Sequence, residues 1–264
     1  MTNSILKHRP ARLFIILAGF FITNALLAEF IGVKIFSLED TVGVERANMP
    51  LFGGSFSFHL SAGVLLWPVV FVMTDIINEY YGPKGVRFLS FLTAGLIVFA
   101  FIMVFLAIHL APSEYFRMGN EIPNPNAAFI GVFGQGLWII IGSLFAFLVG
   151  QILDVFVFHK IKRLTGERKI WLRATGSTLI SQLIDSFVVL FIAFYLGPRL
   201  EGAVEKQWSF GQVMVTGTGN YIYKFVVAIL MTPFIYFVHE LLEKYLGKTD
   251  ADEMRKAAMT RKND

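Results

Sequence analysis

Residues 86–110 read VRFLSFLTAGLIVFAFIMVFLAIHL, an apolar run in which Arg87 is the only Lys, Arg, Asp or Glu. A helix needs about 20 predominantly apolar residues to cross the ~30 Å hydrocarbon core of a bilayer. This run is long enough, and it shows no alternating pattern of the kind found in the short strands of outer-membrane barrels. The stretch therefore predicts a transmembrane helix.

Five other segments have the same character, and the composition agrees with them. The chain has 264 residues, of which 55% are hydrophobic and only 16% are charged, whereas about a quarter of a typical soluble domain is charged. We therefore predict an all-α polytopic membrane protein with six transmembrane helices in one bundle. The predicted spans are 12–36, 58–80, 86–110, 128–158, 174–196 and 213–241.

The distribution of basic residues predicts the orientation of the bundle. Most of the 23 Lys and Arg residues lie before span one, between spans two and three, between spans four and five, or after span six. The loops on the opposite side hold four basic residues against seven acidic ones. By the positive-inside rule, both termini are expected in the cytoplasm. We expect residues 1–246 to form the transmembrane domain and 247–264 a charged cytoplasmic tail, helical or disordered.

Several classes of function are disfavoured at this stage. The net charge of +4 follows the membrane topology rather than one face, so no direct nucleic-acid partner is predicted. The chain has no Cys, which excludes disulfides and thiolate chemistry, and its five His residues form no metal-spaced pair. No cofactor or metal is predicted.

Four ionisable residues lie well inside the predicted spans: Glu29, Asp154, Asp185 and Lys224. An ionisable residue at the centre of a membrane helix costs about 2.5–3.5 kcal/mol when it faces lipid. These side chains are therefore expected to face the interior of the bundle or a wet cavity, where they pair with each other or bind a polar cargo.

The end of span two carries a polar face. Asp75, Asn78 and Glu79 are spaced i, i+3, i+4 and so share one side of a helix. Glu79 is interpreted as an interfacial residue beside Lys84 and Arg87. Asp75 lies deeper, which makes it a candidate functional residue.

Spans four and five share a short pattern, since Gln151 and Asp154 in one correspond to Gln182 and Asp185 in the other. In each pair the i, i+3 spacing places both side chains on one side of a helix. Plain hydrogen bonding between membrane helices would also explain such a polar stripe. Because the two spans run in opposite directions, Asp154 is expected nearer the cytoplasm and Asp185 near mid-depth.

Span six begins with Gly217 and Gly219 and continues through Asn220 to Lys224. A Lys inside the hydrocarbon region needs an acidic or carbonyl partner, and Glu29 is the expected one; a purely structural ion pair is the alternative. In span two, Trp67 is a candidate to stack on a flat ligand, with core packing as the alternative.

These polar residues resemble the queuosine precursor transporter family, which belongs to the vitamin-uptake transporter group of bacterial inner-membrane proteins. The resemblance extends over all six spans in order. It is carried by Asn24 with Ala28 and Glu29, residues 74–82 (TDIINEYYG), Gln151 with Asp154, Gln182 with Asp185, Gly219, Asn220 and Tyr221 with Lys224, and Thr232 with Pro233.

The resemblance implies import of 7-deazaguanine bases, the cyano and aminomethyl precursors of the tRNA nucleoside queuosine. The pairing edge of such a base presents an N–H beside an amino group, a bidentate match for a carboxylate that Gln or Asn can complete. The expected site has two parts. Substrate binding is assigned to Glu29, Gln182, Asp185, Asn220, Lys224, Asn24 and Trp67, and gating or proton coupling to Asp75, Asn78, Gln151 and Asp154.

A stand-alone carrier is favoured, with membrane lipid and a second copy of the chain in a homodimer as its expected partners. Three alternatives remain open. The chain could be the substrate-binding subunit of an energy-coupling-factor transporter, although span one lacks the Ala-x-x-x-Ala pattern of such subunits, since Ala25 and Ala28 are three apart. It could be an intramembrane enzyme that uses Asp154 and Asp185, although no nucleophile or cofactor motif supports this. A purely structural membrane protein is disfavoured by the number of buried acids.

Overall fold

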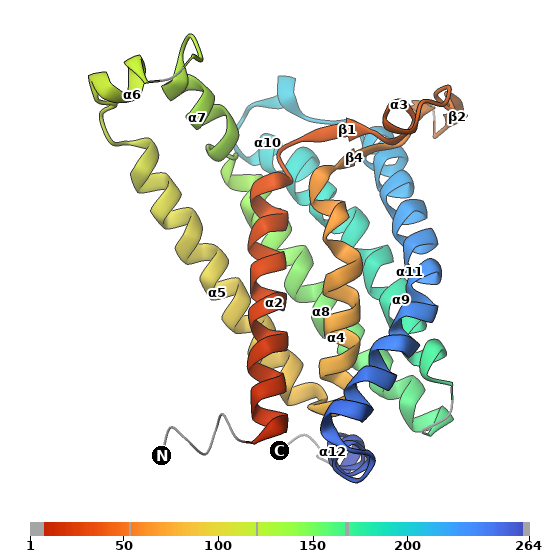
Figure 1. The fold of residues 1–264 in the computed structure, drawn as a ribbon. Helices are drawn as coiled ribbons and strands as arrows, with labels where there is room; N and C mark the ends of the chain where they lie inside the picture. Colours follow the sequence, from red (N-terminus) through yellow and green to blue (C-terminus); the bar gives the residue numbers. More distant parts are fainter. Residues whose placement is uncertain (1–7, 53, 120, 167–168, 261–264) are drawn as a thin grey trace.

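The computed structural model describes residues 8–52, 54–119, 121–166 and 169–260, and helices form most of its framework (Figure 1). The longer helices run side by side along the long direction of the molecule, with α5 splayed outward at one end (Figure 1). Their bounds are α2 Arg9–Ile31, α4 Trp67–Tyr80, α5 Gly82–Ile108, α8 Leu137–Thr165, α9 Ile170–Leu190 and α11 Phe210–Leu246.

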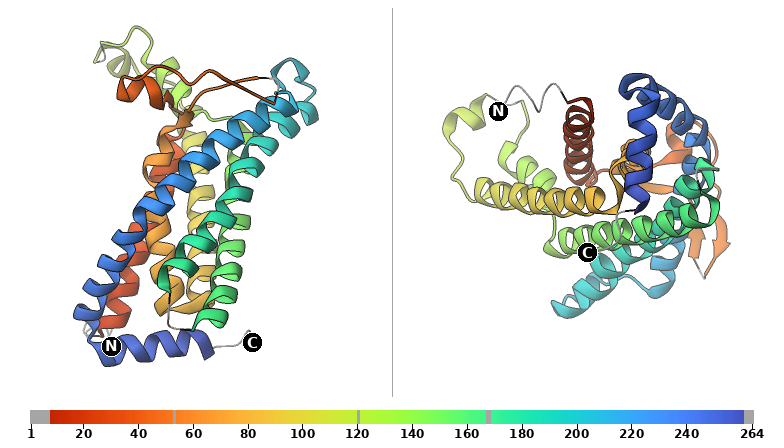
Figure 2. Two further views of the ribbon diagram at one scale, coloured as in Figure 1. Left: turned by 90° about the vertical axis from the view of Figure 1, so that its right-hand side faces the viewer. Right: turned by 90° about the horizontal axis from the view of Figure 1, so that it is seen from below.

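The two ends of this bundle differ. At one end, called the strand end, β1 (Ile35–Ser37) pairs antiparallel with β4 (His59–Ser61), and β2 (Met49–Leu51) pairs with β3 (Gly54–Phe56). At the other end, called the α12 end, α12 (Lys248–Thr260) lies across the helix ends, close to the start of α2 (Figure 2). Short helices complete the strand end: α3 Leu38–Val42, α6 Glu114–Met118, α7 Pro125–Phe133, α10 Gly197–Leu200 and the 3₁₀ turn η3 Val204–Lys206.

Five helical stretches are long and apolar enough to cross a membrane: Arg9–Ile31, Gly82–Ile108, Pro125–Thr165, Ile170–Leu200 and Val204–Leu246. Large apolar side chains such as Phe99, Phe105 and Leu230 are exposed along them, as expected for surfaces that contact lipid. The prediction of an all-α polytopic membrane protein is confirmed.

The predicted second span is wrong in its first part. Residues 58–66 do not continue the helix, because β4 and the 3₁₀ turn η1 (Ala62–Leu65) precede α4, which has 14 residues. Pro68 lies in the first turn of α4, where its missing N–H costs no helical hydrogen bond. Before it, Gly63 packs so closely on the Ala28 carbonyl that a Cβ would lie 2.8 Å from that oxygen.

Two other predicted spans also have different ends. The first ends at Ile31 rather than at residue 36, because the chain turns into β1. The fourth is interrupted between Phe133 and Leu137, where two Gly residues separate α7 from α8. Gly can leave helical geometry at low steric cost, which explains a break inside an otherwise apolar run.

Helices α8 and α9 form the closest pair in the bundle. Gly142, Ala146 and Gly150 line one side of α8, and a Cβ on Gly142 would lie 3.1 Å from the carbonyl oxygen of Val189. The small side chains let the two backbones approach, as is common between membrane helices. After Leu190, α9 continues through a π-helical stretch, η2 (Phe191–Leu196). This close packing fixes the register of the polar residues on α8 and α9.

The segment after Gly247 forms part of the packed structure. Ala251 and Ala258 of α12 are buried, and α12 contacts α4, α5 and α11. Gly82, with φ of +72°, lies against Ala258, and a Cβ there would approach the Ala258 carbonyl oxygen to 3.2 Å. Of the two states expected for this tail, the helical one is observed over Lys248–Thr260, and residues 261–264 lie outside the described part of the chain.

Candidate functional site

The charged pair at the centre of the site joins α9 and α11. Lys224 Nζ lies 2.5 Å from Asp185 Oδ2, and the two side chains are 5% and 6% exposed. The prediction that Glu29 pairs with Lys224 is therefore wrong. Helices α9 and α11 pack directly against each other, whereas α2 makes few contacts with α11, so Asp185 is the carboxylate within reach.

Trp67 forms one wall of this pair. The Lys224 ammonium lies 3.6 Å from the centre of the indole ring, which is a cation–π contact. Trp67 is the first residue of α4, so the end of the 3₁₀ turn η1 determines where the ring is placed. We define the central layer as Trp67, Asp185 and Lys224.

Glu29 lies on α2, and its side chain is partly buried. Ser143 Oγ of α8 donates a hydrogen bond to Glu29 Oε2 at 2.9 Å, and Gln135 Nε2 donates to the Glu29 carbonyl oxygen at 2.8 Å. The carboxylate is thus held by a neutral hydroxyl group. It faces α8 and forms no ion pair with any residue that the structure describes.

The amides predicted for the substrate site differ in how they are bonded. Gln182 is buried one turn before Asp185 on α9, and its Oε1 has no hydrogen-bond partner among the described residues. Asn220 lies one turn before Lys224 on α11 and is partly buried. Asn24, by contrast, donates to the Phe20 carbonyl oxygen of its own helix at 2.7 Å. Gln182 and Asn220 are therefore the amides beside the central pair.

A second layer of polar residues joins α4, α8 and α9. Asp154 accepts hydrogen bonds from Asn78 Nδ2 at 3.2 Å and from Ser177 Oγ at 2.8 Å. Asp75, one turn before Asn78, is also buried. We define the acid layer as Asp75, Asn78, Asp154 and Ser177. Gln151 contacts a different neighbour, because it accepts a bond from Ser90 Oγ of α5 at 3.4 Å.

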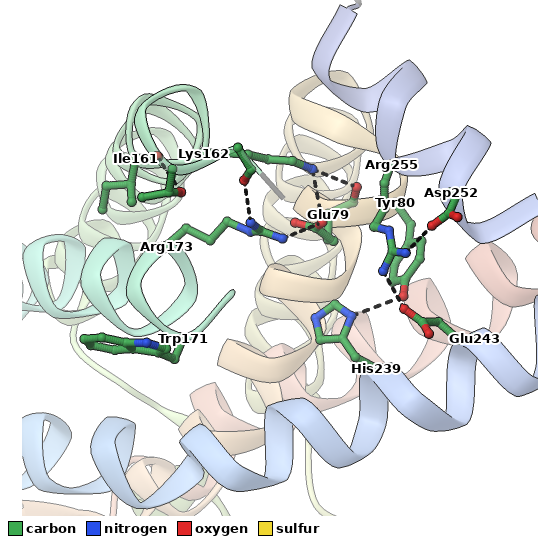
Figure 3. A network of polar contacts seen from close by, with 12 residues as sticks. Glu79, Tyr80, Ile161, Lys162, Trp171, Arg173, His239, Glu243, Asp252 and Arg255 are labelled. Atoms are coloured by element: carbon green, nitrogen blue, oxygen red, sulfur yellow. Dashed lines mark hydrogen bonds and ion pairs between the residues drawn. The ribbon is translucent and has the colours of Figure 1, made fainter. Parts of the chain in front are cut away.

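A third layer is a fully buried ion cluster nearer the α12 end. Glu79 Oε1 lies 2.8 Å from Arg173 of α9 and 3.2 Å from Lys162 of α8 (Figure 3). The interpretation of Glu79 as an interfacial residue beside Lys84 and Arg87 is wrong, because Glu79 is buried while Lys84 and Arg87 are exposed on α5. The fourth predicted span, 128–158, ended too early, and the fifth, 174–196, began too late. Because α8 continues to Thr165 and α9 begins at Ile170, Lys162 and Arg173 are helical and face α4.

Side chains from α11 and α12 cover this ion cluster. Tyr80 Oη lies 3.1 Å from His239 Nδ1, and Arg255 of α12 lies over the Tyr80 ring with its guanidinium carbon 5.9 Å from the ring centre (Figure 3). Arg255 also pairs with Glu243 at 2.5 Å and with Asp252. We define the α12 lock as the ion cluster of Glu79, Lys162 and Arg173. It is named for its position at the α12 end, since its members lie on α4, α8 and α9. The sequence pattern does not reveal this cluster, because Lys162 and Arg173 lie outside the predicted spans, in a stretch that resembles a loop.

Two further observations concern what the site can bind and how it is reached. Among the described residues, no group of three His, Cys, Asp or Glu side chains could hold a metal ion. A hollow of about 300 Å³ lies at the strand end, between the β2–β3 hairpin and the start of α11, where Thr216 is one of the lining residues. Thr216, Asn220 and Lys224 are spaced four apart, so one face of α11 runs from this hollow to the central layer.

Long apolar helices that enclose layers of buried charge are typical of membrane transporters, in which ionisable side chains face the bundle interior. Comparison with known proteins agrees with this class. The chain belongs to the family whose model is described as "Putative vitamin uptake transporter", which matches residues 61–238.

Three curated relatives cover most of the chain. A "Probable queuosine precursor transporter" of Bacillus subtilis (strain 168) is 30% identical over 71% of this chain and 75% of its own length. A protein of the same description from Haemophilus influenzae (strain ATCC 51907 / DSM 11121 / KW20 / Rd) is 26% identical over 88% of both chains. The "Queuosine precursor transporter" of Escherichia coli (strain K12) is 28% identical over 75% of this chain and 81% of its own length. No solved structure matches the chain.

Proposed function

We propose that this protein imports queuosine precursors, which are 7-deazaguanine bases, across the bacterial inner membrane. It acts as a stand-alone secondary carrier with six membrane-spanning segments, and α4 together with η1 forms the second of them. The positive-inside rule places both chain termini and α12 in the cytoplasm, so that the strand end faces outward. The single observation that carries the proposal is the central layer, in which Lys224 and Asp185 meet beside the face of Trp67.

The charges of this pair match the pairing edge of a guanine-type base. That edge presents a carbonyl oxygen, a ring N–H and an amino group in order, so it needs one donor followed by two acceptors. Lys224 supplies the donor, and the two carboxylate oxygens of Asp185 supply the acceptors. A carboxylate that accepts two parallel hydrogen bonds gives both affinity and orientation.

The ring and its substituent have partners of their own. Trp67 offers an aromatic face, and proteins that read an unpaired base combine such stacking with hydrogen bonds to the base edge. Gln182 and Asn220, one turn from Asp185 and Lys224, complete the polar contacts. Glu29 is the second carboxylate, suited to the cation of an aminomethyl precursor. Asn24 is bonded to its own helix and serves as a secondary contact.

Binding of the base requires the central pair to open. In the described conformation the Lys224 ammonium occupies the face of Trp67 and is bonded to Asp185. The base would take the place of the ammonium on the indole ring while Lys224 moves to the carbonyl oxygen of the base. Because both ionised groups are hydrogen-bonded in either state, the exchange avoids leaving an ion without a partner in the membrane interior.

The remaining polar residues suit gating. Asp75, Asn78 and Asp154 form a layer between the central pair and the α12 lock, while Gln151 contacts Ser90 at the edge of this region. A carrier has a barrier on each side of its substrate site, and one must stay closed while the other is open. The α12 lock supplies the barrier on the cytoplasmic side. Residues 1–246 would form the transport domain and 247–264 a tail that covers this barrier.

The test is uptake by a bacterial strain that cannot make queuosine and lacks its own importer. Cells that express this chain are given nanomolar precursor, and queuosine in their tRNA is measured. We expect the wild-type chain to restore queuosine and Asp185→Asn to abolish the restoration. The matched control is Asp40→Asn, which breaks an exposed ion pair with Arg46 at the strand end.

Two outcomes would contradict the proposal. If Asp185→Asn restored queuosine to the wild-type level, the central layer would not be part of the substrate site. No restoration by well-expressed wild-type chain would mean another cargo. If an ATPase co-purifies with the chain and uptake depends on it, the chain is instead the substrate-binding subunit of an energy-coupling-factor transporter.

A further inference from the structure

The acid layer contains oxygen atoms that have no hydrogen-bond donor. Asp75 is 1% exposed, and neither of its carboxylate oxygens has a hydrogen-bond partner among the described residues. Asn78 Oδ1, three residues later on the same helix face, also lacks one, because its amide nitrogen donates to Asp154. A buried carboxylate without a partner does not stay ionised, so it must take up a proton or bind a cation.

The charges around Asp75 point to one proton. Asp75 interacts electrostatically with Asp154 of α8, with Glu79 of its own helix and with Arg173 of α9. Lys162 completes this group through its ion pair with Glu79. Among the residues that the structure describes, these three carboxylates and two basic side chains leave one negative charge unbalanced. A single proton makes the buried group neutral, which is the state that a low-dielectric interior favours.

We propose that Asp75 and Asp154 share one exchangeable proton, and that this proton is the coupling ion of the transport cycle. The coupling part rests on the proposed transport function, whereas the proton site itself does not. In the described conformation the proton lies on Asp75. Asp154 accepts hydrogen bonds from Asn78 and Ser177, and these bonds stabilise its ionised form. The protonated Asp75 becomes a donor, and Asn78 Oδ1 is the acceptor without a donor one turn away.

The ligand atoms fit a proton better than a metal ion. Two oxygens of Asp75 and one of Asn78 in the acid layer have no donor within the described parts of the chain. Ions such as Ca²⁺ and Mg²⁺ bring two positive charges and six or more oxygen ligands, water included, whereas one positive charge makes this group neutral. A proton needs only one donor atom and one acceptor atom, and the layer offers both.

The charged and titratable groups on the neighbouring elements leave this assignment intact. Lys84 and Arg87 of α5 are exposed, and Arg9 and Arg12 of α2 bond to Tyr245 near the α12 end. The groups that face the layer or the lock beside it are Asp154, His159 and Lys162 of α8, Arg173 of α9, Glu79 of α4, His239 of α11 and Arg255 of α12.

The position of the layer explains how proton and barrier are linked. Arg173 interacts with Asp75 as well as with Glu79, to which it is bonded at 2.8 Å. Loss of the proton to cytoplasmic water leaves Asp75 negative and draws the Arg173 guanidinium away from Glu79. The α12 lock is then weakened on the side where the cargo leaves. On the other side, Ser177 lies two turns from Asp185 on α9, so the same helix links the acid layer to the central layer.

The first experiment needs no cargo. Infrared difference spectra of the full-length protein in lipid are recorded between low and high pH, and the C=O stretching band of a protonated carboxyl group is followed. We expect Asp75→Asn to remove one such band and Asp154→Asn to remove or shift it. Asn resembles the neutral carboxyl group in shape and charge, so both variants should fold. Asp40→Asn, which changes an exposed carboxylate paired with Arg46, is the matched control and should keep the band.

The second experiment tests the coupling in proteoliposomes with a 7-deazaguanine base. One coupled proton sustains at most about a tenfold accumulation of a neutral cargo per pH unit of gradient, because each factor of ten is worth about 1.4 kcal/mol. We expect wild type to accumulate the base along the gradient. Asp75→Asn should lose accumulation, because it has no proton to release, but should keep equilibrium binding of the base, because the central layer is unchanged.

The outcomes separate the two proposals. A carboxyl band that is unchanged in both Asp75→Asn and Asp154→Asn overturns the proton site, whatever the cargo. Accumulation driven by a sodium gradient and indifferent to pH overturns the coupling. If wild type binds no deazaguanine but the band is lost in Asp75→Asn, the proton site stands and the proposed cargo fails.

Discussion

Lys224 and Asp185 meet at 2.5 Å between α11 and α9, and the same ammonium group lies on the ring of Trp67. The pair thus satisfies two buried charges while it occupies the aromatic face. Removing either partner alone destabilises the fold, because the other charge is then buried without compensation. This relationship gives the first two predictions.

We expect Lys224→Met to lower the free energy of unfolding by about 3–5 kcal/mol, because Asp185 is left as an unpaired buried acid. The measurement is thermal unfolding of the purified protein in detergent. Adding Asp185→Leu to Lys224→Met should recover most of the stability without recovering transport. Lys244→Met, which breaks an exposed pair with Glu240, should change stability by less than about 1 kcal/mol. Equal effects of the two single substitutions would contradict the prediction.

Trp67 is predicted to contribute to cargo binding through its ring. Stacking of a base on an aromatic side chain is worth about 1–3 kcal/mol, so Trp67→Leu should weaken binding of a deazaguanine by roughly 5–150-fold. Trp67→Phe should lose less, because it keeps an aromatic face. Binding is measured by calorimetry in detergent, with Trp171→Leu on the exposed surface as the control. Wild-type affinity in Trp67→Leu would show that Trp67 only packs.

Glu79 is predicted to hold the barrier at the α12 end. Glu79→Gln leaves the buried Lys162 and Arg173 without their carboxylate, which should destabilise the protein by about 3–5 kcal/mol or open this end. Because the chain has no Cys, a single Cys introduced at Ser177 reports on access. We expect thiol reagents to label that Cys faster from the α12 side in Glu79→Gln. Glu240→Gln, at an exposed site, is the control, and unchanged labelling would refute a barrier role.

Gly82 is predicted to be required for the docking of α12. Its φ of +72° is strained for any other residue, and a Cβ there would press on the Ala258 backbone. Gly82→Ala should therefore release α12, which limited proteolysis after Gly247 would detect. Gly95→Ala is the matched control, because Gly95 lies within α5 with open space around it and Ala favours a helix there. Equal protection of α12 in both variants would contradict this prediction.

The sequence predicted the class of fold and the inward-facing polar residues well, because apolar length and the cost of buried charge act locally. It could not predict the ends of the helices. Residues 58–66 are apolar enough for a span, but the close contact of Gly63 with Ala28 depends on tertiary packing. Residues 159–173 contain enough basic side chains to resemble a loop, yet α8 and α9 extend into them.

Pairing between the predicted site residues was the harder problem. The sequence located Glu29, Asp185 and Lys224 inside the membrane but gave no information on which helices are neighbours. The contact between α9 and α11 decides that Asp185 is the partner of Lys224. The same limit applies to Glu79, whose partners Lys162 and Arg173 are far from it in sequence. The role of each predicted site residue in transport stays a prediction.

The shortness of α4 has a consequence for the way the protein is made. Its 14 residues span about 21 Å as a helix, less than the ~30 Å of the hydrocarbon core, and they include Asp75 and Glu79. Such a segment is a poor substrate for membrane insertion on its own. It would enter the bilayer together with α5, which follows directly at Gly82, or after α2 has provided a surface to pack on. Substitutions that weaken α2 or α5 should then reduce the amount of protein in the membrane before they affect any step of transport.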